Sequence, residues 1–333
     1  MQAQTKFAEQ AIGVEKLQAA FARAVLAAQE FEGATAPNPP VGCVILDADG
    51  EELAVAAHQK AGQPHAEALA IQHCREAGTI DLIHTFIVTL EPCNHHGRTP
   101  PCSEAILATP AKYIWIGTKD PNPHVAGGGA DCLRAVGLDV QFWPEGQWAQ
   151  KAWRLIAPFS KLKSTGVPWV TVKQAMNLEG TMIPPLGQKT FTSPSSLKLA
   201  HQLRKRADAI ITGSGTVLAD APLFNVRHVP DFEGKRRKLV VLDRRKRVPQ
   251  NYFDAAAQSG FDVVQVQSIE VALQKLGAAG AMEVLVEAGP KVTKSILASG
   301  LWDEHVLIQQ TAGDDIISTM ENTKKGQHVL RHH

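Results

Sequence analysis

The sequence predicts an α/β protein of two domains, and three observations lead to this fold class. The chain has 333 residues, which at roughly 150 residues per domain is enough for two sizeable cores. Helical spacings of apolar residues alternate with short apolar runs in both halves, as in layered folds with a mostly parallel sheet. The apolar fraction of 44% and the charged fraction of 20% are typical of globular proteins and exclude wholesale disorder.

The first half begins with an amphipathic helix, because Val14, Leu17, Phe21 and Val25 recur at helical spacing. The apolar run 41–46 is followed by Asp-Ala-Asp-Gly, a turn signal, and is therefore predicted to be a strand. Further helices are expected near 64–78, 102–108 and 130–136, and further strands at 85–90, 113–117 and 138–142.

The second half repeats this alternation without repeating the sequence. Residues 144–166 have a mixed amphipathic pattern that ends in Lys-Ser-Thr-Gly, which indicates a domain boundary. We therefore place the first domain at residues 1–148 and the second at residues 149–333. In the second half, strands are expected at 169–173, 209–212, 238–242, 262–266, 283–286 and 305–308, and helices near 194–206, 269–278 and 291–299.

Charge and cysteine content narrow the class of protein. The chain has 34 Lys and Arg against 33 Asp and Glu, a formal net charge of +1, which argues against a polybasic binder of nucleic acid or membrane surfaces. No apolar run approaches the 18 or so residues of a spanning helix, and residues 1–10 lack the apolar core of a signal peptide. Five cysteines, an odd number, indicate reduced thiols or metal ligands. We expect a cytoplasmic protein.

A zinc site is predicted in the first domain from four residues. His65 and Glu67 lie at the start of a helix, Cys93 follows a buried strand, and Cys102 opens the next helix. One imidazole and two thiolates leave the fourth tetrahedral position for water, the arrangement of a catalytic zinc, which lowers the pKa of that water. Glu67 could then pass a proton to a leaving amine. The alternatives are a structural metal or inert thiols. The remaining cysteines are expected in or near the core: Cys43, Cys74 and Cys132.

Four segments of the first domain carry a family resemblance. They are Pro37 to Cys43 (PNPPVGC), His65-Ala66-Glu67, the run EPCNHHGRTPPC at 91–102, and Asp120-Pro121-Asn122-Pro123. Together they closely resemble the bifunctional deaminase–reductases of riboflavin biosynthesis. Eight residues separate the two predicted cysteine ligands, where other zinc nucleobase deaminases have two. The resemblance covers nearly all of the first 143 residues and implies a cytidine-deaminase-like α/β/α sandwich.

The resemblance implies a reaction and a set of contacts for the first domain. The reaction would be deamination of 2,5-diamino-6-ribosylamino-4(3H)-pyrimidinone 5′-phosphate, with zinc on the three predicted ligands and Glu67 as the proton shuttle. Arg98 suits a phosphate and Asn38 a pyrimidine edge, although Asn38 could equally be a turn residue between prolines. His96 is interpreted as an exposed loop residue. The implied substrate contacts are Asn38, His58, His95, Arg98, Asp120 and Asn122.

The second domain resembles the partner reductase, which has a dihydrofolate-reductase-like α/β fold and uses NADPH to reduce the ribosyl group to ribityl. Gly289-Pro290 at a helix start presents free N–H groups suited to a phosphate. Arg244 follows a strand and could bind the 2′-phosphate of NADPH. The implied NADPH contacts are Ala175, Thr190, Thr216, Asp220, Arg244, Gly289, Pro290, Lys291, Val292, Thr293, Lys294 and Ser295, and the implied substrate contacts are Gln188, Arg204, Phe224, Arg227 and Glu287.

The second domain departs from the family pattern in several places. Asn177-Leu178-Glu179-Gly180 replaces Ser-Leu-Asp-Gly, Thr190 stands where Trp is usual, and Ala221 replaces the second Asp of Asp-Asp-Pro. A polar stretch, 311–327, takes the place of an expected Lys-Leu-Leu-Gly-Gly-like segment. The last strand of the domain is therefore expected to be lost or rebuilt.

Two alternatives to a bifunctional enzyme remain open. One is a deaminase whose reductase domain is degenerate, which the departures from the pattern suggest. The more distant one is a nucleic-acid base deaminase, suggested by the basic runs 235–238 and 244–247. Those runs lack interleaved aromatics, and we interpret them mainly as solvated loop charge around a strand. The expected partners are a small phosphorylated pyrimidine, no nucleic acid and no membrane, and a homo-oligomer is left open.

Overall fold

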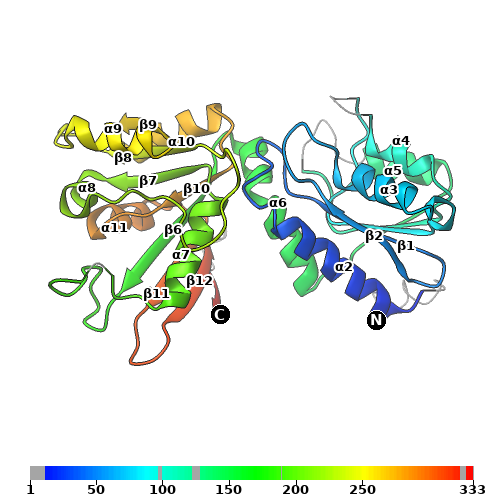
Figure 1. Cartoon of the computed structure of the whole chain (residues 1–333), viewed down its shortest axis with the longest axis horizontal. Helices are drawn as coiled ribbons and strands as arrows, with labels where there is room; N and C mark the ends of the chain where they lie inside the picture. The colour runs from blue at the N-terminus through cyan, green and yellow to red at the C-terminus, as the bar shows by residue number, and fades with distance from the viewer. Residues whose placement is uncertain (1–11, 97–99, 122–127, 189, 323–327, 333) are drawn as a thin grey trace. The chain divides into compact units, whose positions relative to one another are not determined.

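The computed structural model describes residues 12–96, 100–121, 128–188, 190–322 and 328–332, with only the backbone for the last of these segments. The chain divides into two compact units, residues 1–164 and residues 165–333 (Figure 1). The sequence pattern predicts this division at 148/149 instead. The difference is due to the helix α6 (Gln147–Thr165). Its residues Ala152, Leu155 and Ile156 are buried in a core of the first unit, which therefore extends to residue 164.

The first unit is built on a sheet with strand order β2-β1-β3-β4-β5. Strand β1 is antiparallel to both β2 and β3, whereas β3, β4 and β5 are parallel. The strands are β1 (Gly42–Leu46), β2 (Glu52–Ala57), β3 (Thr85–Val88), β4 (Tyr113–Ile116) and β5 (Asp139–Phe142). The helices are α2 (Val14–Gln29), α3 (Ala66–Glu76), the short 3₁₀ helix η1 (Ile80–Leu82), α4 (Cys102–Leu107), α5 (Gly128–Ala135) and α6.

Side chains of β1 alternate between two cores, which makes this unit an α/β/α sandwich. Cys43 and Ile45 pack in one core with residues of α3, α4 and α5, while Val44 and Leu46 pack in the other with residues of α2 and α6. Figure 1 shows α3, α4 and α5 above the sheet and α2 below it. The predicted fold class is confirmed. Strand β2 is not predicted from the sequence, because Glu-Leu-Ala-Val-Ala-Ala is equally typical of a helix.

Helix α2 lies so close to β1 that position 42 requires a glycine. A Cβ added to Gly42 would collide with the carbonyl oxygen of Ala24, in the middle of α2. Because the obstacle is backbone, it can yield only if the whole helix moves away from the sheet.

Gly42→Ala is expected to lower the free energy of unfolding by about 2 to 3 kcal/mol, the usual cost of overpacking a tight core. Urea unfolding of the purified protein measures the change. Gly13→Ala is the matched control, since an added Cβ there meets nothing within 4 Å. Equal unfolding midpoints for the two variants would contradict the close packing of α2 on β1.

The second unit is built on a larger sheet with strand order β13-β12-β11-β6-β10-β7-β8-β9. Strands from β11 across to β9 are parallel, whereas β12 and β13 are antiparallel. The strands are β6 (Trp169–Met176), β7 (Ala209–Gly213), β8 (Arg237–Leu242), β9 (Phe261–Val266), β10 (Glu283–Val286), β11 (Glu304–Gln309), β12 (Ile316–Asn322) and β13 (His328–His332). The helices are α7 (Pro194–Arg206), α8 (Ser214–Asp220), α9 (Gln250–Gln258), α10 (Ile269–Ala278) and α11 (Pro290–Ser299).

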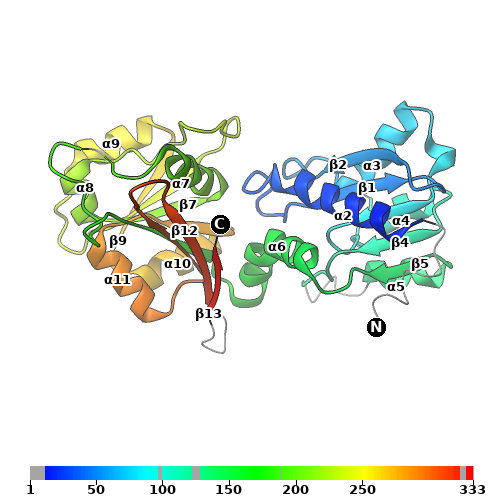
Figure 2. The ribbon, with the colours of Figure 1, turned by 90° about the horizontal axis from the view of Figure 1, so that it is seen from below.

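The carboxyl-terminal edge of this sheet is rebuilt rather than lost. Strand β12, from within the polar stretch 311–327, pairs with β11 from Glu304↔Glu321 to Gln309↔Ile316. Strand β13 then pairs with β12, as Figure 2 shows in red. Ser318 is buried, and Met320 packs against one of the hydrophobic cores of this unit. Polar residues can therefore form this strand because it lies near a sheet edge and is only partly covered.

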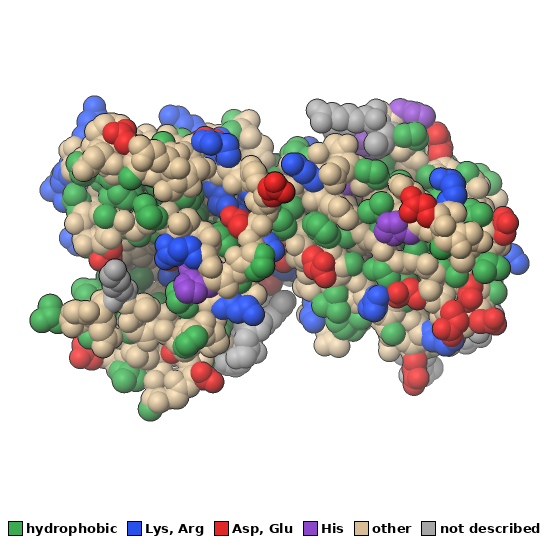
Figure 3. All heavy atoms as spheres, in the orientation of Figure 1, with side chains coloured by type: hydrophobic (Ala, Val, Ile, Leu, Met, Phe, Trp, Pro, Cys, Tyr) green, Lys and Arg blue, Asp and Glu red, His purple; other side chains and the backbone are tan. Residues whose placement is uncertain are grey.

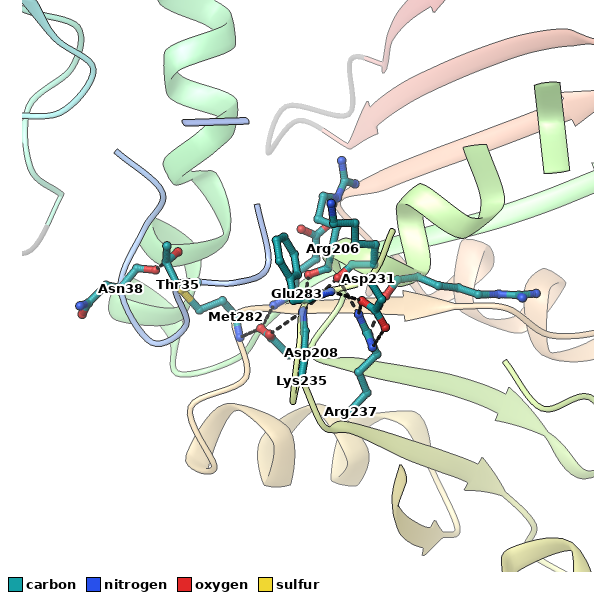
Figure 4. A network of polar contacts seen from close by, with 12 residues as sticks. Thr35, Asn38, Arg206, Asp208, Asp231, Lys235, Arg237, Met282 and Glu283 are labelled. Atoms are coloured by element: carbon teal, nitrogen blue, oxygen red, sulfur yellow. Dashed lines mark hydrogen bonds and ion pairs between the residues drawn. The ribbon is translucent and has the colours of Figure 1, made fainter. Parts of the chain in front are cut away.

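One of the two basic runs is partly buried, so its interpretation as solvated charge is wrong. The side chains of Lys235 and Arg237 are only 10% and 6% exposed. Arg237 pairs with Asp231 at 2.6 Å, and Lys235 lies 3.6 Å from Asp208 (Figure 4). Burial lowers the pKa of Lys235 to about 8, although Asp208 opposes this shift. These cations stabilise the amino-terminal end of β8 and do not form a basic surface.

The same buried network continues to the neighbouring strands. Arg206, at the end of α7, contacts Glu283 at 2.7 Å and Glu304 at 2.6 Å. These two glutamates begin β10 and β11, and the hydroxyl of Thr171 on β6 lies within hydrogen-bonding distance of both, at 3.1 Å from Glu283 and 2.8 Å from Glu304. The network joins three adjacent strands at one end of the sheet.

Among the described residues, no helix is both long and apolar enough to cross a membrane.

Candidate active sites

Three side chains in the first unit are arranged like the protein ligands of a zinc ion. The nitrogen Nδ1 of His65 lies 3.3 Å from Sγ of Cys102 and 3.6 Å from Sγ of Cys93, and all three atoms lie within 4.8 Å of one another. Zn–S bonds of about 2.3 Å and Zn–N bonds of about 2.0 Å at tetrahedral angles would place nitrogen and sulfur about 3.5 Å apart. The residues therefore fit zinc in identity and in spacing.

Each of the three predicted ligands is fixed by the start of a helix or lies in the loop after a strand. His65 is the residue immediately before α3, and Cys102 is the first residue of α4. Cys93 follows β3, and the backbone N–H of Cys102 donates to its sulfur at 3.4 Å. Ser103 Oγ donates to Asn94 Oδ1 at 2.7 Å, which ties the loop to α4. The hydrogen bond with Cys102 lowers the pKa of Cys93 to about 4 despite its burial, so one thiolate is available at neutral pH.

Glu67 lies beside the three ligands and shares a cavity with them. It is in the first turn of α3 and is only 3% exposed. It lines a cavity of about 440 Å³ together with His65 and Cys93. Burial raises the pKa of Glu67, which the charge of His65 opposes. A buried carboxyl group next to a metal position is suited to moving protons.

Asn38 and His58 form one wall of the same cavity. Nδ1 of His58 lies 3.0 Å from the carbonyl oxygen of Pro64 and must carry the proton, because a carbonyl oxygen only accepts. Burial lowers the pKa of His58, so its Nε2 is an acceptor for the Nδ2 amide of Asn38 at 3.4 Å. The amide of Asn38 is thereby oriented, which favours the binding interpretation of this residue over that of a simple turn residue.

The remaining predicted contacts of the first unit fall into two groups. His95 and Asp120 line the cavity, whereas Arg98 and Asn122 lie outside the described residues. His96 is exposed and contacts Glu104 at 3.1 Å, as expected for a loop residue. The other thiols have the environment expected of them: Cys43 and Cys74 are buried, and Cys132 is half-buried.

Glu91 is a buried residue of this site that the sequence analysis missed. Its Oε2 accepts from the backbone N–H of Asp120 at 3.2 Å, and its Oε1 accepts from that of Ala130 at 3.0 Å. One carboxylate thus links Asp120, shortly after β4, to the first turn of α5. The available signal was a carboxylate directly after a buried strand and before the Pro-Cys ligand pair.

In the second unit the predicted residues Arg204 and Glu287 form a bidentate ion pair. Nε and Nη2 of Arg204 donate to the two carboxylate oxygens of Glu287 at 2.8 and 2.7 Å, and Lys173 lies 2.9 Å from the same carboxylate. Burial alone would raise the pKa of Glu287, but Lys173 and Arg204 hold it well below its usual range. The sequence analysis missed Lys173, because a lysine within a strand carries no local signal of its partner.

His201 connects the two predicted arginines. It is fully buried on α7, its Nδ1 accepts from the backbone N–H of Arg227 at 2.9 Å, and its Nε2 lies 3.4 Å from Nη1 of Arg204. Burial, together with the nearby positive charges of Arg204 and Arg227, lowers the pKa of His201 to about 4. A neutral His201 therefore positions both Arg204 and Arg227. Sequence reasoning did not identify it, since one His on a helix is usually a core residue.

Two of the segments predicted to bind NADPH are in contact, the one containing Thr216 and the one that begins at Gly289. The backbone N–H of Gly289, just before α11, donates to Oγ1 of Thr216 at 2.8 Å. This contact joins the start of α8 to the amino end of α11, where N–H groups are free to bind a phosphate. Thr293 uses its hydroxyl to donate to Ala288 O at 3.1 Å, and Val292 packs against the core. The side chains of Val292 and Thr293 are therefore directed into the unit and are not available to a ligand.

The other predicted contacts of this unit are more scattered. The Phe224 ring is buried in the core, with the Arg204 guanidinium 5.8 Å above it. Arg244 was the residue predicted for the cofactor site, but it is Nη2 of Arg247 that donates a hydrogen bond to Oγ of Ser214, at 3.0 Å. Ala175 is half-buried on β6. The remaining side chains are exposed: Gln188, Thr190, Asp220, Arg227, Arg244, Lys291, Lys294 and Ser295.

Comparison with known proteins assigns the chain to a family. The model of the cytidine and deoxycytidylate deaminase zinc-binding region matches residues 14–118, and that of the RibD C-terminal domain matches residues 168–310. Riboflavin biosynthesis protein RibD of Escherichia coli is 34% identical over 319 residues, which cover 86% of this chain and 85% of that protein. The protein of the same name from Aquifex aeolicus is 33% identical over 303 residues, covering 84% and 83%. The chain belongs to the RibD family.

Solved structures of RibD proteins agree with this assignment. Acinetobacter baumannii RibD, form 1, superposes with a TM-score of 0.76 at 33% identity and covers 91% of this chain and 89% of its own. A diaminohydroxyphosphoribosylaminopyrimidine deaminase/5-amino-6-(5-phosphoribosylamino)uracil reductase from Thermotoga maritima superposes with a TM-score of 0.78 at 31% identity, covering 90% and 89%. RibD is a bifunctional family of riboflavin biosynthesis. The expected cofactors, zinc and NADPH, are those of its zinc-binding deaminase region and reductase domain.

Cys102→Ala is expected to abolish stoichiometric zinc binding, because two remaining protein ligands cannot form a stable tetrahedral site. The measurement is zinc content per chain by mass spectrometry after dialysis. Cys132→Ala is the control, because this half-buried cysteine lies outside the three-ligand cluster. Full zinc content in the Cys102 variant would show that this residue is not a ligand.

His201→Gln is expected to reduce the acid sensitivity of the second unit. The pKa of His201 is lowered from 6.5 to about 4, so the unfolded state binds a proton between these pH values and the folded state does not. The stabilisation is fully present above pH 6.5 and is lost as the pH falls towards 4. In urea unfolding at pH 7, 6 and 5, the parent should lose more stability than the variant. His228→Gln, at an exposed neighbour, should behave like the parent, and parallel profiles for parent and H201Q would contradict the assignment.

Proposed function

We propose that this chain catalyses two consecutive steps of riboflavin biosynthesis. The first unit would deaminate 2,5-diamino-6-ribosylamino-4(3H)-pyrimidinone 5′-phosphate by hydrolysis. The second unit would reduce the ribosyl group of the product to ribityl with NADPH. The observation that carries the proposal is the cluster of one imidazole and two thiols, whose spacing suits a tetrahedral zinc ion, with buried Glu67 in the same cavity. Membership of the RibD family supports the choice of substrate.

In the first unit, His65, Cys93 and Cys102 would hold the zinc. Zinc bound there supplies Lewis acidity that makes water a nucleophile near neutral pH. Glu67 would take a proton from that water and give it to the departing amine, so that ammonia leaves. The oriented amide of Asn38 would present its oxygen to the pyrimidine, with His58 holding the amide in place. His95, Arg98, Asp120 and Asn122 are proposed as further substrate contacts.

In the second unit, the amino end of α11 with Thr216 would bind a phosphate of NADPH. Arg204 and Arg227, held by His201, would bind the substrate, and Glu287 would fix Arg204 and Lys173. NADPH supplies the hydride, and these residues position the ring-opened sugar to receive it. The remaining proposed contacts are Ala175, Gln188, Thr190, Asp220, Phe224, Arg244 and Gly289 to Ser295.

The two alternatives find less support. The intact Lys173–Glu287–Arg204 cluster and the rebuilt sheet edge favour a working reductase over a degenerate domain. A nucleic-acid substrate is disfavoured by the buried ion pairs of Lys235 and Arg237. On the face drawn in Figure 3, Lys and Arg side chains are scattered and do not form one continuous basic area. We accordingly propose a small-molecule substrate, no nucleic-acid partner and a cytoplasmic location, with oligomerisation left open.

A coupled assay with Glu67→Gln tests the proposal. With the diaminopyrimidinone phosphate, the parent should release ammonia and oxidise an equal amount of NADPH. Glu67→Gln should keep its zinc but lose at least 10³-fold of the ammonia release, roughly the contribution of general acid–base catalysis. The same variant should oxidise NADPH normally when supplied with the deaminated product. Normal ammonia release by E67Q would contradict the role of Glu67, and a parent without either signal would overturn the proposed substrate.

A further inference from the structure

The cavity of the first unit has a wall that comes from outside the deaminase region. The family model of that region ends at residue 118, but Phe159 and Lys163 of α6 line the cavity together with Glu67 and His65. Neither side chain belongs to the motifs that identify the deaminase. Helix α6 therefore adds cavity-lining residues to a site whose predicted metal ligands lie far earlier in the chain.

The position of Lys163 follows from the packing of its helix. Ala152, Ile156, Phe159 and Lys163 succeed one another at intervals of four, three and four residues, so they share one face of α6. The first two are buried in the core with α2, and Phe159 is 8% exposed. Lys163 is exposed and lies where this face leaves the core. Its Nζ is 5.4 Å from the centre of the Phe159 ring, a cation–π contact that keeps the ammonium group near the cavity.

The charges around the cavity give this lysine a particular role. Among the described residues that line it, Lys163 alone carries a permanent positive charge, whereas Glu67, Glu91 and Asp120 are acidic. A phosphate of nearly two negative charges is held more strongly where a cation faces it than where only carboxylates do. Glu67 is buried deep in the cavity and Lys163 is exposed at its border. The pyrimidine amine would thus point inward and the phosphate outward.

We propose that Lys163 binds the 5′-phosphate of the deaminase substrate and contributes to the selectivity of this unit for phosphorylated pyrimidines. This assignment rests on the proposed deaminase function and extends it to the end of the substrate remote from the reacting carbon. Lys163 is a binding residue and takes no part in proton transfer. Its contribution should therefore appear in the affinity for substrate and not in the rate of the chemical step.

The test compares Lys163→Gln with the parent on two substrates, the diaminopyrimidinone ribosyl phosphate and its dephosphorylated form. For the phosphorylated substrate, KM should rise about 10- to 100-fold, the worth of a charge-assisted hydrogen bond, while kcat changes less than twofold. For the dephosphorylated substrate, the parent and K163Q should have equal kcat/KM. Lys163→Arg should recover most of the loss, because it restores the charge.

Lys151→Gln is the matched control. Lys151 is on the same helix and also lies over an aromatic ring, 4.3 Å from the centre of that of Trp148, but it is not among the residues that line the cavity. Its variant should retain the KM of the parent for both substrates. A thermal unfolding scan and the zinc content of each variant confirm that the site is intact.

The affinity for substrate can also be measured in a variant that is not expected to catalyse the deamination. In the Glu67→Gln background, titration calorimetry should give a dissociation constant for the phosphorylated substrate that rises about 10- to 100-fold on adding Lys163→Gln. If the parent deaminates and K163Q prefers the phosphorylated substrate as strongly as the parent, the role of Lys163 is overturned while the deaminase function stands. If the parent releases no ammonia from either substrate, the proposed function itself fails, and this inference fails with it.

Discussion

Both sites depend on one constraint: a helix that follows a parallel strand begins at the edge where the strand ends. This arrangement places free backbone N–H groups and the first side chains of the helix beside the strand's last residues. In the first unit it brings Cys102, at the start of α4, against Cys93 after β3. In the second unit it brings Gly289, before α11, against Thr216 near the start of α8. The chemistry differs, but the geometry that gathers the groups is the same.

The residues that could be predicted from sequence are those whose signal is local. His65 and Glu67 lie two positions apart at a helix start, and Cys93 stands in a Pro-Cys pair after an apolar run, so their chemistry is evident before any fold is known. The layered fold could be predicted for the same reason, since strand and helix periodicities are properties of short windows. The short strand β2 was missed because its alanine-rich composition suits either structure.

The residues that could not be predicted act through partners distant in the sequence. Arg204 and Glu287 were each expected to contact substrate, but their ion pair was not foreseen because they are 83 positions apart. Nothing near Lys173 indicates that it will contact the same carboxylate. His201 acts through the backbone of a loop 26 residues later. The buried lysine and arginine in the run 235–238 were taken for surface charge because a sequence does not reveal which carboxylates will neutralise them.

Helix α6 has a consequence for how this enzyme could be divided or could have arisen by gene fusion. The first half of α6 completes the core of the deaminase unit, and its second half lines the cavity. The helix is therefore part of the deaminase unit and not only a linker between the two units. A stand-alone deaminase cut at the end of its recognisable sequence motif would expose Trp115 and Phe21, which now pack in the same core as Ile156. Any ancestral or engineered separation of the two activities must therefore leave this helix with the deaminase or replace it.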